Sequence, residues 1–138
     1  MSQENVEVVG RSIDAFNRAF NRGDLEGFLE FVTSDIEWLP VMGAMDRDGS
    51  FRGRAGVKAY FDILRDAWED LAFEPGYEVR DLGEKTLMLG RLQGHGRGSG
   101  VIVDTPIAVL YAHRGAQISR IQSFYDPADA LKAVGLEK

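Results

Sequence analysis

Residues 85–125 read KTLMLGRLQGHGRGSGVIVDTPIAVLYAHRGAQISRIQSFY, and this stretch decides the fold. Three runs within it, at 87–95, 101–112 and 117–125, are rich in the β-branched, aromatic and long aliphatic residues that favour strands. Turn sequences separate the runs, the first being RGSG at 97–100, where glycine can adopt a positive φ angle. The stretch therefore predicts an antiparallel meander of three strands.

A four-residue turn at 97–100 sets the register of the first hairpin. Gly96 then pairs with Val101, and Gln93 pairs with Asp104. One face of the hairpin carries alternate residues of both strands, namely Leu87, Leu89, Arg91, Gln93, His95, Asp104, Pro106, Ala108 and Leu110. A single carboxylate opposite an arginine and an amide, on a face that is otherwise apolar, is the most site-like arrangement in the chain. A shift of one residue in the turn would move the arginine and the histidine to the other face.

The rest of the chain predicts helices first and strands afterwards. Apolar residues with helical spacing predict a helix at about 3–21, a short helix capped by Asp24, an aromatic helix at about 55–70 and a terminal helix after Asp126. Strands are predicted at 36–39 and 73–80, with a loop at 41–52 across the open end of the domain. This order predicts an α+β fold in which helices pack on the concave face of a curved sheet. The hollow between them would be a mostly apolar pocket for a small molecule.

Composition limits the function classes. With 138 residues the chain predicts a single domain covering 1–138, and 44% hydrophobic residues are enough for a core. A net charge of −6 opposes nucleic-acid binding, because the nucleic-acid backbone is itself densely negative. There is no cysteine, no apolar run of membrane-spanning length and no signal-like N-terminus. We therefore expect a cytoplasmic protein that contacts neither nucleic acid nor membrane.

The order of elements, together with AFN at 15–17, NRGDL at 21–25, SDIEW at 34–38, FRG at 51–53 and the segment 115–125, resembles the nuclear-transport-factor-2-like superfamily. More narrowly, the chain is similar to the SnoaL-like branch, whose relatives include ketosteroid isomerases, polyketide cyclases and epoxide hydrolases. The resemblance covers essentially the whole chain. It implies a cone-shaped, cystatin-like α+β barrel with a curved antiparallel or mixed sheet, and a homodimer formed through the outer face of that sheet.

The resemblance also identifies positions where activity can be tested. Ketosteroid isomerases use a tyrosine on the first helix, an aspartate base after the first strand and an acid in a later strand. These positions fall at Phe16, Leu39 and Ala108 in this chain. None of the three can donate or accept the required proton, so the ketosteroid isomerase mechanism is not expected here.

Asp104, Arg91 and His95 are the predicted catalytic residues. Inside the cone, Arg91 would keep Asp104 ionised as a base, and His95 would exchange a proton near neutral pH. The alternative is a cross-strand ion pair near a solvated hairpin tip. The residues predicted to bind the ligand are Trp38, Tyr60, Trp68, Leu89, Gln93, Ala108 and Tyr125.

No cofactor and no metal are predicted. The two histidines lack the spacing of a zinc pair, His113 is expected to be exposed at a turn, and the glycine-rich turn lacks a P-loop lysine. The leading hypothesis is a pocket for a small apolar or polycyclic compound that supports cofactor-independent acid/base chemistry, such as isomerisation, cyclisation, dehydration or hydrolysis. The alternatives are a noncatalytic dimeric binding module and a protein-interaction domain. The latter would use an outward sheet face that includes Val109, Tyr111, Arg120, Gln122 and Phe124.

Overall fold

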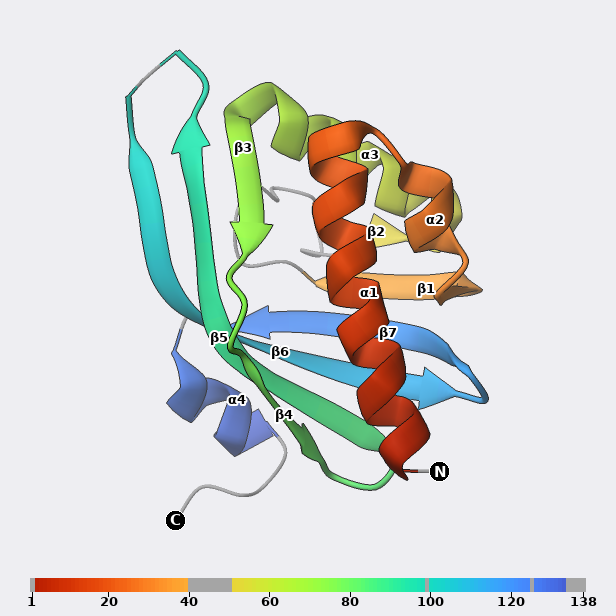
Figure 1. Ribbon diagram of the computed structural model, residues 1–138. Helices are drawn as coiled ribbons and strands as arrows, with labels where there is room; N and C mark the ends of the chain where they lie inside the picture. Colours follow the sequence, from red (N-terminus) through yellow and green to blue (C-terminus); the bar gives the residue numbers. More distant parts are fainter. Residues whose placement is uncertain (1, 40–50, 99, 125, 134–138) are drawn as a thin grey trace.

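The computed structural model describes residues 2–39, 51–98, 100–124 and 126–133, and these form an α+β fold (Figure 1). The helices are α1 (Ser2–Arg22), α2 (Leu25–Leu29), α3 (Gly53–Ala67) and α4 (Pro127–Ala133). The strands are β1 (Val32–Leu39), β2 (Phe51–Arg52), β3 (Trp68–Phe73), β4 (Glu78–Asp81), β5 (Lys85–Gly96), β6 (Ile102–Arg114) and β7 (Gln117–Phe124).

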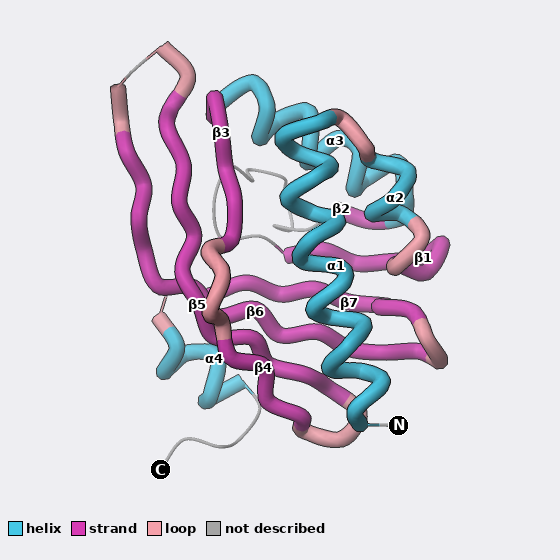
Figure 2. The backbone as a smooth tube through the Cα atoms, in the orientation of Figure 1, coloured by secondary structure: helices cyan, strands magenta, loops and turns pink. Residues whose placement is uncertain are grey.

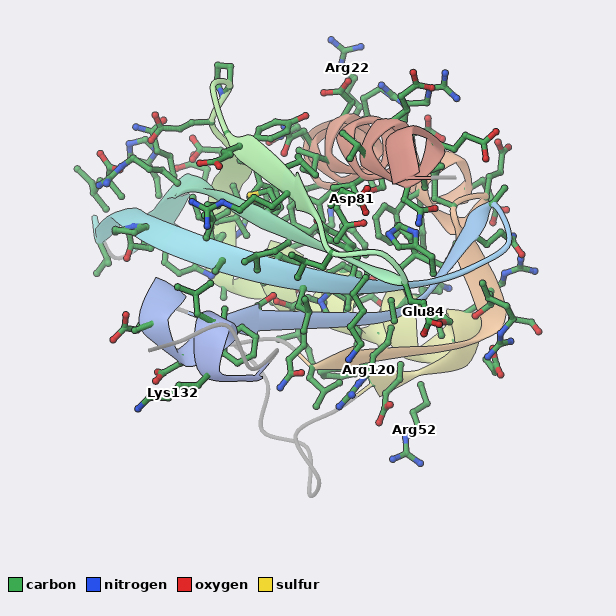
Figure 3. The ribbon with its side chains drawn as sticks, turned by 90° about the horizontal axis from the view of Figure 1, so that it is seen from below. Arg22, Arg52, Asp81, Glu84, Arg120 and Lys132 are labelled. Atoms are coloured by element: carbon green, nitrogen blue, oxygen red, sulfur yellow. The ribbon has the colours of Figure 1, made fainter. Side chains whose placement is uncertain are left out.

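The strands form one mixed, curved sheet in the order β2-β1-β7-β6-β5-β3, and β4 pairs with the other half of β5. The pair β1–β7 is parallel and every other pair is antiparallel. Figure 2 shows α1 lying across one face of the sheet, and Figure 3 shows α4 on the opposite side. The predicted α+β class with a curved mixed sheet is confirmed.

The larger hydrophobic core lies between α1 and the inner, concave face of the sheet. Residues from α1, α2 and α3 pack there against Met88 and Leu92 of β5 and against Ile107, Val109 and Tyr111 of β6. A period of two along β6 and of three to four along α1 turns these side chains to one interface. Burial of this apolar surface is the main stabilising term of the fold.

A second, smaller core lies on the outer face of the same strands. Leu87, Ala108 and Leu110 pack there with Ala130 of α4. The concave face therefore does not hold all the helices, because α4 covers part of the outer face (Figure 3).

Side-chain amides join α1 to the edge of the sheet. Asn17 accepts a hydrogen bond from the backbone N–H of Phe73 at 3.0 Å and donates one to its carbonyl oxygen at 3.3 Å. One turn later, Asn21 donates to the carbonyl oxygen of Leu71 at 3.3 Å. These bonds satisfy backbone groups of the edge strand β3 that no neighbouring strand pairs.

Several elements differ from the predictions. β1 begins at Val32, which the pattern assigned to the preceding helix. Helix α3 ends at Ala67 rather than near residue 70, because Trp68 already pairs with Gly96 at the start of β3. The single strand predicted at 73–80 is instead two strands, separated by a turn in which Gly76 has φ of 91°. Residues 41–50 of the predicted loop lie outside the described residues, and its last two residues form β2 instead.

The hairpin register is confirmed. Gln93 pairs with Asp104 and Arg91 with Pro106, and the Gly96 N–H donates to the Val101 carbonyl at 2.7 Å. The predicted caps are also present, since Asp24 accepts from the Gly27 N–H at 3.2 Å at the start of α2.

Candidate functional site

The Arg91–Asp104 pair predicted from the sequence is present, but it lies on the outer face of the sheet. Arg91 Nε donates to Asp104 Oδ1 at 2.9 Å, and Gln93 Nε2 lies 3.5 Å from the other carboxylate oxygen. The two side chains of the ion pair are 48% and 47% exposed. The expectation that Asp104 faces a dry hollow is therefore wrong, because α1, α2 and α3 pack on the opposite face of these strands.

Electrostatics keep Asp104 ionised. The hydrogen bond from Arg91 is the main cause that lowers the pKa of Asp104, and Gln93 adds to the effect. His95 does not join this pair, since its Nδ1 lies 2.8 Å from Asp70 Oδ1 and its side chain is 55% exposed. A half-exposed carboxylate with a lowered pKa is a weak base, which weighs against Asp104 as a catalytic base. The catalytic role of Asp104, Arg91 and His95 stays a prediction.

The predicted ligand-binding residues divide between the two faces. Leu89 and Ala108 belong to the outer cluster that packs on α4, so their predicted position inside the hollow is wrong. Trp38 and Tyr60 are buried in the inner core with ring centroids 5.0 Å apart, and Trp68 is partly buried against that core. Gln93 is exposed on the outer face, and Tyr125 lies outside the described residues.

The inner core contains a cavity of about 20 Å³, which is room for roughly one water molecule. It lies between α1, β1 and the β6–β7 pair, with contributions from α2 and β3. Its lining residues are Ser12, Ile13, Phe16, Phe28, Trp38, Phe73, Val109, Tyr111, Ile121 and Ser123. No charged side chain is among them, and four of the ten are aromatic residues without a hydroxyl.

Aromatic rings close the cavity. The ring of Phe16 has its centroid 5.1 Å from that of Phe73 and 6.2 Å from that of Trp38, and Phe28 stacks on Trp38 at 5.4 Å. Such pairs add to the energy of burial. Phe73 and Ser123 are the half-buried members of the lining, whereas Phe16 and Trp38 are buried.

Three hydroxyl groups provide the polarity of the lining. Ser12 on α1 donates to the carbonyl oxygen of Val9 at 2.8 Å. Tyr111 on β6 lines the same cavity. Burial raises the pKa of Tyr111, so its phenol stays neutral across the physiological range. The third hydroxyl group of the lining belongs to Ser123 on β7. Of this lining the sequence prediction named Trp38 as a ligand-binding residue, and it missed Val109 and Tyr111 because it assigned them to the outward face.

A sequence signal for the inner face was present in the glycines of β5. A Cβ on Gly90 would lie 2.9 Å from Tyr77 Cβ, and one on Gly94 would lie 2.5 Å from a backbone oxygen of β3. Both glycines lie on the same face as Met88 and Leu92, where the chain packs closely. The polar residues of β5 alternate with them and point outward.

His113 lies at the other end of the inner face, and the expectation that it is exposed is wrong. Its Nε2 is 2.6 Å from the hydroxyl oxygen of Thr86, a fully buried residue. Burial lowers the pKa of His113, and the nearby charge of Asp81 opposes this effect in part. His113 does not line the cavity.

Two further findings concern metals and membranes. Within the described residues, no group of three or more histidine, aspartate or glutamate side chains is placed to hold a metal ion. None of the described helices is both long enough and apolar enough to cross a bilayer.

The sequence of this chain matches the model of a known family. The model of the SnoaL-like domain matches residues 13–121, which is most of the chain. The chain belongs to the SnoaL-like family. The match includes α1, the aromatic core and the whole β5–β6 hairpin. Among curated proteins, none matches this SnoaL-like chain significantly.

Solved structures agree with this family. An NTF2-like protein from Burkholderia xenovorans LB400 is 24% identical with a TM-score of 0.73, and the match covers 91% of this chain and 92% of that one. A proposed SnoaL-like polyketide cyclase from Jannaschia sp. CCS1 is 21% identical with a TM-score of 0.75, covering 99% and 95% of the two chains. TerC, co-crystallised with polyporic acid, is 19% identical with a TM-score of 0.74 over 96% and 98%. At these identities the likeness shows the fold alone.

Proposed function

We propose that this SnoaL-like protein binds a small, uncharged, aromatic molecule between α1 and the inner face of the sheet. The observation that carries the proposal is the lining of the cavity, which is aromatic and aliphatic with three hydroxyl groups and no charged side chain among the described residues. A ligand site of this kind is mostly apolar and has a few polar groups that orient the ligand. A related fold, that of TerC, was crystallised with polyporic acid, which supports a small-molecule role.

The lining favours binding without chemical conversion. Proton abstraction needs a basic group within hydrogen-bonding distance of the substrate. No carboxylate or imidazole is among the described lining residues, and Phe16 stands where the ketosteroid isomerases have a tyrosine. The acidic Asp104 is separated from the cavity by the sheet itself. This evidence supports the noncatalytic alternative over the acid/base enzyme.

Ligand entry requires side chains to move. The cavity of about 20 Å³ is far smaller than the roughly 300 Å³ of an ordinary small-molecule site. Phe16 and Phe73 are the rings whose rotation would enlarge it, because they touch each other and one of them is half-buried. The proposed ligand is therefore flat and takes the place of a ring within the aromatic cluster.

The two tryptophans of the chain allow a direct test with 1-naphthol as the probe. Trp38 lines the cavity and Trp68 does not, so the indole N–H signals in an NMR spectrum report two different places. Trp68→Phe assigns the signals and leaves Trp38 as the remaining indole. Titration is expected to shift the Trp38 signal strongly and the Trp68 signal weakly, with the naphthol recovered unchanged.

Three results would contradict the proposed binding site or its noncatalytic role. An unmoved Trp38 signal at millimolar 1-naphthol, with the fold intact, would remove the proposed site. Movement of the Arg91 side-chain N–H signal instead would place binding on the outer face. Chemical conversion of an identified ligand by the wild-type protein would restore the enzyme hypothesis.

The proposal retains the homodimer that the resemblance implies, formed through the outer face of the sheet. Arg52 and Arg120 project from this face (Figure 3), and each lies 3.4 Å from a carboxylate oxygen of Glu37. At the hairpin tip the neighbouring Val101 and Ile102 are 54% and 69% exposed, which gives apolar surface that a second copy could cover. Sedimentation at high concentration tests this part, and a monomer would refute it.

A further inference from the structure

The inner cavity shares a wall with an open groove on the surface. This groove has a volume of about 310 Å³ and lies between α1 and the segment that joins β3 to β4 (Figure 2). Its lining residues are Ile13, Asp14, Asn17, Phe73, Pro75, Gly76 and Tyr77. Ile13 and Phe73 also line the cavity, so the two spaces meet at these two side chains.

Phe73 is the side chain that can join the two spaces. Ile13 is 2% exposed, whereas Phe73 is half-buried. The backbone of Phe73 is fixed by its two hydrogen bonds with Asn17, at 3.0 and 3.3 Å, and by pairing with Leu92 of β5. Its ring can therefore turn about the side-chain bonds while the strand stays in place. With the ring turned, the joined space reaches the roughly 300 Å³ of an ordinary small-molecule site.

The groove differs from the cavity in its chemistry. Asp14 is the one charged side chain among the described residues that line the groove, and it is exposed. Its carboxylate has no hydrogen bond or ion pair with any other described residue. The Asn17 amide is already committed to the backbone of Phe73. Because a carboxylate only accepts hydrogen bonds and repels anions, the groove favours a donor over an acid.

We propose that the groove and the cavity are the two ends of one ligand site, with Phe73 as the gate between them. The ligand is then an aromatic ring with a short arm that ends in a hydrogen-bond donor rather than in an acid. This inference rests on the proposed function, which places the uncharged ring beside Phe16 and Trp38. It adds the polar arm, which passes Phe73 and points its donor to Asp14.

Three phenols that differ only in the arm test the two-part site by NMR. 4-Ethylphenol has no polar arm, 2-(4-hydroxyphenyl)ethanol ends in a hydroxyl, and 4-hydroxyphenylacetate ends in a carboxylate. The hydroxyl-armed phenol is expected to shift both the indole N–H of Trp38 in the cavity and the amide of Gly76 in the groove. A shift of Trp38 with Gly76 unmoved would overturn the two-part site and leave the proposed function standing. A shift of neither signal, or of Gly76 alone, would overturn both.

Calorimetry with the same phenols tests the role of Asp14. The wild-type preference for the hydroxyl arm over the carboxylate arm is expected to be about two- to fivefold larger than that of Asp14→Asn, because like charges near the surface repel weakly. Asp62→Asn is the matched control, since it changes the net charge equally at an exposed position of α3 outside the groove lining. An unchanged preference in Asp14→Asn, or an equal loss in both variants, would refute the donor end of the arm.

Association rates test the gate. Phe73→Ala is expected to bind the hydroxyl-armed phenol about tenfold faster in stopped-flow measurements of tryptophan fluorescence, because no ring has to turn before entry. Phe28→Ala is the control, since Phe28 lines the cavity but not the groove, and its rate should stay near that of the wild type. Phe73→Leu should give an intermediate rate and replaces the alanine variant if circular dichroism shows that variant to be unfolded. Equal acceleration at positions 73 and 28, or none at 73, would refute the gate.

Discussion

Replacement of Phe16 by alanine tests whether the aromatic cluster blocks a ligand site. Phe16 is 6% exposed, and its ring lies between 5.1 and 6.3 Å from the rings of Phe28, Trp38, Phe61 and Phe73. Loss of a buried phenylalanine costs about 3–5 kcal/mol. The variant should remain mostly folded, since domains have unfolding free energies of about 5–15 kcal/mol. At about 4 °C per kcal/mol for a chain of this size, the melting temperature should fall by about 12–20 °C.

The ligand response distinguishes this variant from an ordinary core defect. The enlarged cavity should bind 1-naphthol at least about tenfold more tightly, because no ring has to move first. A naphthol concentration one hundred times its Kd should restore about 2.7 kcal/mol, or about 10 °C of melting temperature. Phe20→Ala is the matched control, since Phe20 is 4% exposed on the same helix but does not line the cavity.

The control should lose similar stability and show almost no rescue by 1-naphthol in the same differential scanning experiment. Two results would refute the reasoning. One is a Phe16→Ala variant whose melting temperature does not respond to naphthol. The other is equal rescue of the Phe16 and Phe20 variants, which would mean that any cavity in this core accepts the ligand.

Three further predictions concern the outer face, the pH dependence and the strand packing. Asp104→Asn breaks the half-exposed ion pair with Arg91 on the outer face, away from the cavity, so the affinity for naphthol should not change. A large loss of affinity, measured by calorimetry, would place the ligand site on the outer face. The pKa of His113 is lowered below about 6.5 in the folded state, so the unfolded chain binds protons first as pH falls. The contribution of the neutral His113 to the free energy of unfolding is therefore complete above about pH 6.5 and should decrease as the pH falls below it. In denaturant titrations from pH 7.5 to 5.5, His113→Gln should show a smaller decrease than the wild type. Gly94→Ala should destabilise the sheet, because the new Cβ would lie 2.5 Å from a backbone oxygen. Gly10→Ala in helix α1 is the control: its new Cβ would lie 3.6 Å from the nearest atom, so this variant should be neutral or stabilised by up to about 1 kcal/mol. Equal melting temperatures of the two variants would contradict this packing.

Much of the fold could be predicted because local chemistry and tertiary structure agree. The turn at 97–100 fixed the register of the β5–β6 hairpin, and helical spacing fixed α1 to within one residue at each end. Boundaries were wrong where a tertiary contact overrides local preference. Trp68 continues the apolar stripe of α3 in the sequence, yet it begins β3 because β5 offers a partner edge at Gly96.

The site could not be assigned to the correct face from alternation alone, since both faces of the hairpin base are apolar. Met88, Val109 and Tyr111 pack under α1, while Leu87 and Leu110 pack under α4. A periodicity of two tells which residues share a face, but it does not tell which face the larger helices cover. The Arg91–Asp104 pair was correctly predicted as a pair and wrongly placed, because the terminal helix takes up the apolar surface beside it.

The most direct test of the central claim is a crystal of this SnoaL-like protein soaked with 4-iodophenol, with the iodine located by its anomalous scattering. The structure predicts an iodine peak between α1 and the β6–β7 pair, flanked by Phe16 and Trp38, with the phenol oxygen next to Tyr111. An iodine peak beside Arg91 and Asp104, or none under conditions that saturate binding in solution, would contradict the claim that the ligand site lies inside the curved sheet.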